Sequence, residues 1–216
     1  MSQITASEVK ALREQTGAGM MDCKKALVEA EGDMAKAADI LAKKNLAAAG
    51  KRADKVAAEG AVGSYVHGGR IGVLVEINSE TDFVGRSDQF QALLKDIAMH
   101  VAASNPTYLD DSEIPEAVVA KQAEIFLAQQ ADSGKPEHIL PRIVEGKVKK
   151  WKSEVCLLDQ AFVKDTDKTV RQHVTEVAAT IKEKISVRRF VRFELGEGIE
   201  KKQEDFAAEV AAAAVV

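Results

Sequence analysis

The sequence predicts an α+β fold in which short helices precede an antiparallel three-stranded sheet that packs against further helices. Residues 60–67, 71–78 and 187–195 alternate between two faces at the period of a β-strand. Residues 5–44 and 89–104 instead carry apolar groups at the three- and four-residue spacing of amphipathic helices. A chain of 216 residues, 46% of them apolar, can build the cores that such a fold needs.

Composition excludes several classes of protein. The formal net charge of −4 argues against direct nucleic-acid binding, which needs clustered Lys and Arg. No run reaches the ~18 apolar residues of a membrane span, and residues 1–5 lack the features of a secretory signal. The two cysteines, Cys23 and Cys156, give neither a disulfide framework nor a metal-ligand spacing. We therefore expect a cytoplasmic protein with no membrane contact, no metal and no other cofactor.

Residues 1–44 are expected to form a small domain of three helices. Thr5 and Glu8 have the spacing of a capping box at the start of the first helix. Glycines within residues 16–19 end that helix, and Asp33 can cap the third. So few residues bury little surface, and we expect this domain to be only marginally stable alone.

Residues 45–58 are Ala-rich and are interpreted as a helical or flexible linker whose basic side chains form a solvated face. The core domain is expected over 59–195. Its first two strands, 60–67 and 71–78, flank Gly68-Gly69, a turn signal because glycine tolerates positive φ in both central positions. The helix that follows carries one apolar stripe, which consists of Phe90, Leu93, Leu94, Ile97, Ala98 and Val101.

A helical hairpin is expected over residues 116–152, because two helical patterns are joined by the short link 133–136. Pro141 either lies in the opening turn of the second helix or delays its start. In the third strand the apolar groups fall mainly on one face, with Phe190 on the other, which predicts a central or partly covered strand. Residues 196–216 are expected to form a carboxy-terminal helical module.

The residues that could carry catalysis do not group. No histidine has a partner at metal-ligand or triad spacing, and each is interpreted as a structural or surface residue: His67, His100, His138 and His173. Cys23 and Cys156 lie in apolar patterns and are expected to be buried, Cys156 in a strand-like run. There is no phosphate-binding loop and no nucleophile elbow. We therefore expect a protein that is not an enzyme.

Two short motifs remain as candidate recognition surfaces. Thr16-Gly17-Ala18-Gly19-Met20-Met21 presents two adaptable thioethers after a glycine turn, although from pattern alone these methionines staple the small core. Thr81-Asp82-Phe83-Val84 follows directly on the second strand, where a rigid scaffold favours binding chemistry. From pattern alone Phe83 is a core residue.

These motifs resemble signatures of the elongation factor Ts family, the guanine-nucleotide exchange factors for elongation factor Tu. The amino-terminal signature is similar to residues 16–27, and the core signatures are similar to residues 65–74, 80–84, 97–103 and 192–200. Long members of the family carry two related core halves, whereas this chain has one. The resemblance implies that two chains form a homodimer to supply what one long chain has.

The resemblance also implies roles for individual residues. The amino-terminal domain, similar to ubiquitin-associated domains, would dock on the nucleotide-binding domain of elongation factor Tu through Leu12, Arg13, Met20 and Met21. Thr81, Asp82, Phe83 and Val84 would enter near the magnesium site of that partner, with Phe83 as a wedge and Asp82 disturbing the polar network around the ion. His67 would also face the partner. The alternative is a passive helical adaptor that binds other proteins through its amino-terminal domain.

Overall fold

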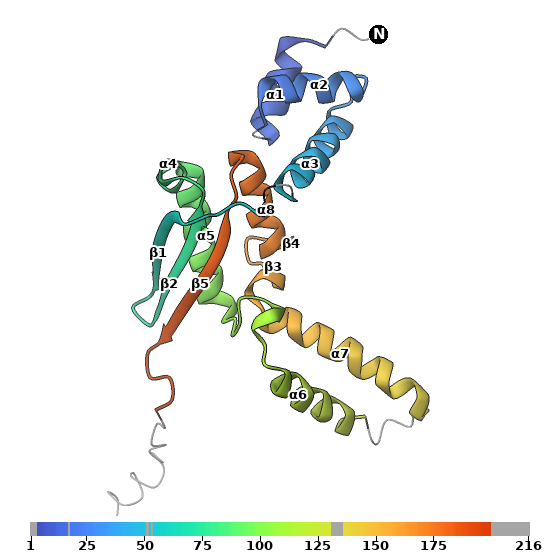
Figure 1. Ribbon diagram of the computed structural model, residues 1–216, viewed down its shortest axis with the longest axis vertical. Helices are drawn as coiled ribbons and strands as arrows, with labels where there is room; N and C mark the ends of the chain where they lie inside the picture. Colours follow the sequence, from blue (N-terminus) through green and yellow to red (C-terminus); the bar gives the residue numbers. More distant parts are fainter. Residues whose placement is uncertain (1–3, 17, 51, 53, 131–135, 200–216) are drawn as a thin grey trace, which may run out of the picture.

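The computed structural model describes residues 4–16, 18–50, 52, 54–130 and 136–199. It confirms the predicted α+β fold, with amino-terminal helices followed by a three-stranded antiparallel sheet and its helices. The molecule is elongated, with the three-helix unit at one end, the sheet in the middle and the helical hairpin at the other end (Figure 1). Within the described ranges no helix combines the length and apolarity that crossing a membrane requires. The helix expected near the carboxy terminus lies outside them.

The amino-terminal domain consists of α1 (Ala6–Thr16), α2 (Met20–Glu29) and α3 (Met34–Gly50). Its capping box forms as predicted, since the Thr5 amide donates to Glu8 at 2.7 Å and the Glu8 amide donates to the Thr5 hydroxyl at 3.3 Å. The Asp33 carboxylate accepts two amides at the start of α3. The third helix extends to Gly50, so the first part of the expected linker is helical.

The main sheet has the order β1 (Glu59–His67), β2 (Ile71–Ser79), β5 (Ser186–Glu194), and both neighbouring pairs are antiparallel. Gly68 and Gly69 take φ of 54° and 69° in the turn between β1 and β2, as their pairing predicted. One face of the sheet packs on α5 (Asp88–Ser104). The predicted apolar stripe of α5 is buried there against Val73, Val75 and Ile77.

Of the two alternatives for the third strand, partial cover is confirmed, since Val187 is buried and Phe190 packs against the core, and a central position is wrong. β2 is central and β5 is an edge strand. A bulge displaces its alternation, because Arg189 pairs with Glu76 while Val187 pairs with Ile77. Residues 187 and 190 therefore lie on the covered face, and residues 191 and 193 lie on the open face.

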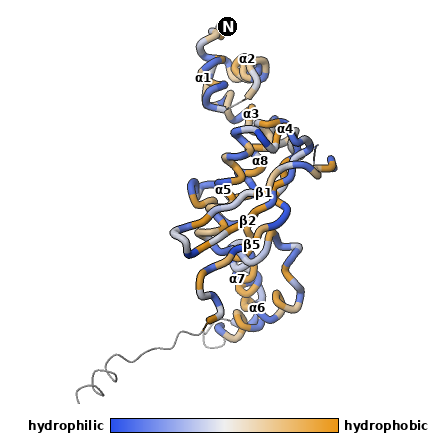
Figure 2. The backbone as a smooth tube through the Cα atoms, turned by 90° about the vertical axis from the view of Figure 1, so that its left-hand side faces the viewer, coloured by the Kyte–Doolittle hydropathy of each residue, from blue (hydrophilic) through white to orange (hydrophobic). Residues whose placement is uncertain are grey.

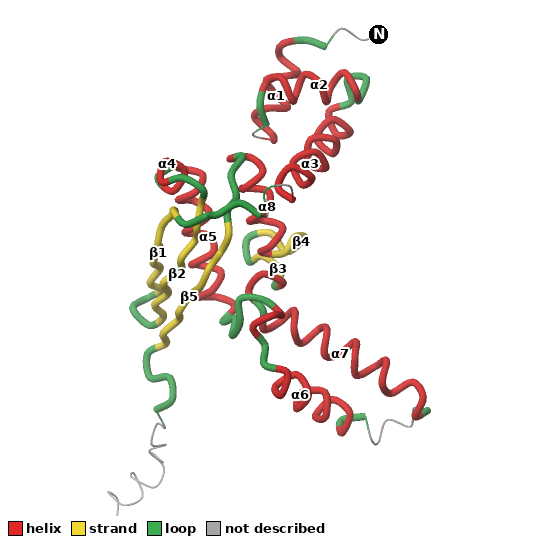
Figure 3. Tube along the Cα trace, viewed as in Figure 1, coloured by secondary structure: helices red, strands yellow, loops and turns green. Residues whose placement is uncertain are grey.

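The remaining elements cover the sheet and extend from it. After α5 come a 3₁₀ turn η1 (Asp111–Glu113), α6 (Glu116–Ala128), η2 (Glu137–Ile139), α7 (Leu140–Val155), η3 (Leu157–Asp159), β3 (Ala161–Phe162), β4 (Asp165–Thr169) and α8 (Val170–Ile181). The two helices of the hairpin, α6 and α7, point away from the body, and Pro141 lies in the first turn of α7 (Figure 3). Cys156 is buried as expected, but it forms an isolated bridge with Tyr108 instead of a strand.

Candidate functional site

The end of β2 that lies opposite the Gly68-Gly69 turn, here called the tip, projects an aromatic side chain into solvent. β2 ends at Ser79, and the single-turn helix α4 (Asp82–Gly85) follows. Thr81 caps α4, with its hydroxyl accepting the Val84 amide at 3.5 Å. Phe83 is 80% exposed, whereas Val84 is buried in the core. The pattern-based assignment of Phe83 to the core was therefore wrong, because a one-turn helix can bury only one side of itself.

The backbone beneath Phe83 is held at close quarters. A Cβ on Gly85 would lie 2.8 Å from the carbonyl oxygen of Gly60, so only glycine allows α4 to approach β1 this closely. The side-chain amide of Gln91 donates to the Gly85 carbonyl at 2.6 Å, and the Ser79 hydroxyl donates to the Thr81 carbonyl at 2.8 Å. These contacts hold the backbone that carries Phe83 in place.

The charged residues of the tip have different surroundings. Among the described residues Asp82 forms an ion pair only with Arg86, at 3.1 Å, and both side chains are more than half exposed, so this ion pair is weak. Glu80 is 14% exposed, and the ammonium of Lys55 and the amide of Lys184 hold the pKa of its carboxyl below the usual range. Lys55 belongs to the segment that we interpreted as a solvated face; its side chain is 56% exposed, and its ammonium pairs with Glu80.

The amino-terminal domain presents a second surface. Met20 is 44% exposed and Met21 is 66% exposed at the start of α2. The pattern alone had indicated that these methionines pack in the small core, and that interpretation was wrong. Arg13 is exposed on α1. Leu12 is fully buried in the three-helix core, where it supports this surface from within.

His67 lies far from the tip, at the other end of the sheet. Its Nδ1 is 3.0 Å from the Tyr65 hydroxyl, and the two rings stack. Eight residue steps along β1 separate the end that pairs with Ser79 from His67, a distance of roughly 26 Å at the rise of a β-strand. The expected site residues therefore do not share one cleft. They lie on separate surfaces of the molecule.

The other histidines and the cysteines form no catalytic group. His100 is buried, accepts the Val163 amide at 3.2 Å and lies 2.9 Å from the Gln160 side chain, and burial lowers its pKa. Burial likewise raises the pKa of the Cys156 thiol to about 11, so it carries no thiolate at neutral pH.

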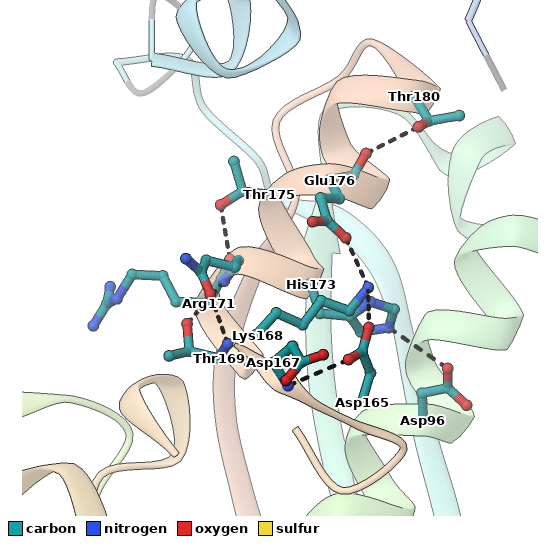
Figure 4. Close-up of polar contacts among 11 residues, drawn as sticks. Asp96, Asp165, Asp167, Lys168, Thr169, Arg171, His173, Thr175, Glu176 and Thr180 are labelled. Carbon is teal, nitrogen blue, oxygen red and sulfur yellow. Dashed lines mark hydrogen bonds and ion pairs between the residues drawn. The ribbon is translucent and has the colours of Figure 1, made fainter. Parts of the chain in front are cut away.

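His173 lies in a cleft of about 800 Å³ that is lined by α3, α5 and α8. Its ring stacks on Phe162 at 4.3 Å and lies 3.5 Å from the Asp96 carboxylate, while Lys168 nearby pairs with Glu176 (Figure 4). Burial, and then Lys168, lower the pKa of His173. Among the described residues, no group of three His, Cys, Asp or Glu side chains could hold a metal ion.

Sequence reasoning missed one residue of the tip. Glu183, 102 residues further along the chain, accepts both the amide and the hydroxyl proton of Thr81. No local pattern marks Glu183, since only folding brings the end of α8 to the end of β2.

An exposed aromatic side chain at the tip and a separate surface with two exposed methionines are features typical of proteins that recognise other proteins. Comparison with known proteins gives the family of this chain. A sequence model of the family described as "Elongation factor TS" matches residues 9–197. Elongation factor Ts of Geobacter sulfurreducens is 58% identical over 212 residues, 98% of each chain. The corresponding proteins of Desulforamulus reducens and Acetivibrio thermocellus are each 58% identical, over 213 and 208 residues, with at least 96% of each chain covered.

The chain belongs to the elongation factor Ts family, and it is a translation elongation factor of protein biosynthesis.

Proposed function

We propose that this protein accelerates the release of GDP from elongation factor Tu in the cytoplasm. The observation that carries the proposal is Phe83, a large apolar side chain that is 80% exposed on an otherwise rigid tip. Burial of such a side chain by a partner surface stabilises the complex. Membership of the elongation factor Ts family makes elongation factor Tu the partner that we propose.

The mechanism that we propose is displacement of the partner's magnesium ion and phosphate contacts. Magnesium demands near-octahedral coordination and bridges nucleotide phosphates to protein oxygens. Phe83 would wedge these ligands apart, and Asp82, with only a weak partner in Arg86, would compete for the polar groups around the ion. Thr81 and Val84 anchor the wedge at either side. Coupling is reciprocal, so nucleotide would weaken binding of this protein by the same factor, about 5–150-fold for typical couplings.

Residues 1–44 would dock on the nucleotide-binding domain. Met20 and Met21 are the exposed contacts, Arg13 adds charge, and Leu12 holds the helices that present them. His67, at the far end of β1, would reach a second part of the partner. Residues 45–58 join the docking domain to the core of 59–195, and residues 196–216 would add contact beyond the sheet.

We also propose that two chains form a homodimer through the open face of the sheet. This face is apolar along two neighbouring rows, since Leu74 pairs with Val191 and Gly72 lies between Val66 and Phe193. Val66 and Phe193 are each 67% exposed and Leu74 is 48% exposed. Figure 2 shows the sheet from the side, with the amino-terminal helices at one end and the hairpin at the other. A contiguous apolar patch of this kind is typical of an interface, and a two-fold axis would bring it against its own copy.

Light scattering tests the dimer. At micromolar concentration we expect twice the mass of one chain, and Phe193→Lys should halve it because the charge would be buried against the partner copy. A single-chain mass for the unchanged protein would contradict the proposal.

The exchange function is tested by stopped-flow release of a fluorescent GDP analogue from elongation factor Tu at fixed magnesium. We expect strong acceleration when this protein is added. Binding without acceleration would favour the passive adaptor instead, and would refute nucleotide exchange.

A further inference from the structure

The turn between α8 and β5 contacts both surfaces of the proposed exchange factor. It consists of Lys182, Glu183 and Lys184. Lys182 closes α8 in the left-handed conformation, with φ of 67° and its amide bonded to Ala178 at 2.8 Å. Because the helix stops here, the two residues that follow are directed at the tip of β2.

Glu183 forms hydrogen bonds with Thr81, the residue directly before the helix that carries Phe83. Its carboxylate accepts the Thr81 hydroxyl proton at 2.7 Å and the Thr81 amide at 3.1 Å. A hydroxyl has one proton and two lone pairs. Once its proton points at Glu183, a lone pair is left to accept the Val84 amide at 3.5 Å, which is the cap of α4. Glu183 therefore sets the orientation of the cap that carries Phe83.

Glu80 makes the same connection in the opposite direction. Its carboxylate, in the strand-to-helix corner, accepts the Lys184 backbone amide at 2.7 Å and the Lys55 ammonium at 2.7 Å. The guanidinium of Arg52 lies 3.5 Å from Glu80 and donates to the Lys182 carbonyl. The turn and the tip are thus joined by charge-assisted hydrogen bonds from both sides, and such bonds are stronger than those between neutral groups.

The turn also contacts the amino-terminal domain. The Lys182 ammonium lies 3.2 Å from the carboxylate of Asp22, the residue after Met21. Both side chains are more than half exposed, so this ion pair contributes little. The strong connection is the one from Glu183 to Thr81.

We infer that Glu183 is the positioning residue of the wedge: it holds Thr81, and through it Phe83, in the orientation that acts on the partner. The inference rests on the proposed exchange function for its consequence, but not for its geometry. A wedge that is already ordered loses little conformational freedom when it enters the partner, which raises the rate of the step that it promotes. Without Glu183 the tip keeps its glycine contact with β1 but loses the constraint on its cap.

The test compares Glu183→Ala with Glu176→Ala, a matched control that removes an acid from the neighbouring helix α8, away from the tip. In stimulated GDP release we expect Glu183→Ala to lower kcat about tenfold with KM changed less than threefold, since Met20 and Met21 still dock. The kcat of Glu183→Gln, which keeps one acceptor oxygen, should lie between that of Glu183→Ala and that of the unchanged protein. Glu176→Ala should behave as the unchanged protein. Unaltered kcat for Glu183→Ala would overturn the inference.

A second measurement does not depend on exchange activity. The amides of Arg86 and Ser87 bond to the carbonyls of Phe83 and Val84 at 3.2 and 2.9 Å, within the wedge turn and not to Glu183. In the free protein, Glu183→Ala should speed hydrogen exchange at these amides about tenfold, with no change in α5. If Glu183→Ala leaves the protection of these amides unaltered, the inference is overturned, whether or not the original protein stimulates GDP release. If the substitution speeds hydrogen exchange but the original protein does not stimulate GDP release, only the proposed function is refuted.

Discussion

Replacement of Phe83 by alanine separates the function of this protein from its stability. Full burial of a phenylalanine side chain stabilises a fold by ~1.5–3 kcal/mol. Phe83 keeps 80% of its surface in solvent, so the fold gains only about a fifth of that, at most about 0.6 kcal/mol. The melting temperature should therefore fall by no more than about 2 °C.

The loss should instead appear in the partner complex. If elongation factor Tu buries the rest of the ring, truncation removes about 1.2–2.4 kcal/mol, which corresponds to a decrease of about 7- to 50-fold. The assay is the concentration dependence of stimulated GDP release, from which kcat/KM is obtained, alongside a thermal melt of the free protein.

Leu127→Ala provides the matched control. Leu127 is a 48% exposed apolar side chain on the distant hairpin helix α6, so its removal should leave GDP release nearly unchanged, although loss of its buried half should lower the melting temperature by up to about 6 °C. If Phe83→Ala keeps full kcat/KM, or if its exchange loss is matched by a melting temperature lower by more than about 5 °C, the wedge assignment is refuted.

Three further predictions concern the fold. Gly63→Ala would place a Cβ 2.5 Å from Cγ of buried Leu94; we expect a loss of ~1–3 kcal/mol in urea unfolding, and an unchanged midpoint would contradict this packing. Gly146→Ala meets nothing within 4 Å in helix α7, so the gain in helix propensity should raise stability by up to about 1 kcal/mol. Burial lowers the pKa of His100 and of His173 in the folded chain. The unfolded chain therefore binds more protons below ~6.5, and the free energy of unfolding should fall as pH decreases from there toward the folded pKa. Urea unfolding at pH 7.5 and 5.5 checks this, and His100→Gln should reduce the difference.

Features that depend on neighbouring residues were predicted correctly from the sequence. The stripe of α5, the capping box of Thr5 and Glu8 and the turn at Gly68-Gly69 all formed as predicted. Each depends on the spacing or the backbone preference of residues close together in the chain, and both can be read directly from the sequence. The presence of a motif at the end of β2 was predictable for the same reason.

Other features depended on how distant segments meet. The faces of β5 follow from a bulge opposite Glu76, which a strict alternation hides. Phe83 is exposed because its one-turn helix buries Val84 instead. Leu12 is interior because three helices close around it. These outcomes are decided by packing, so residue type alone predicted Phe83 wrongly and did not distinguish Leu12 from the surface beside it.

The sequence by itself determined the fold class, the amino-terminal helices, the three strands of the main sheet and the family, because periodicity, capping and turn preferences are local properties of the chain. Only the tertiary structure decided which side chains reach solvent and which distant charges meet. Glu183 and Thr81 are 102 residues apart and joined by two hydrogen bonds. No spacing in the sequence encodes that contact, since it exists only once the turn after α8 lies beside the end of β2.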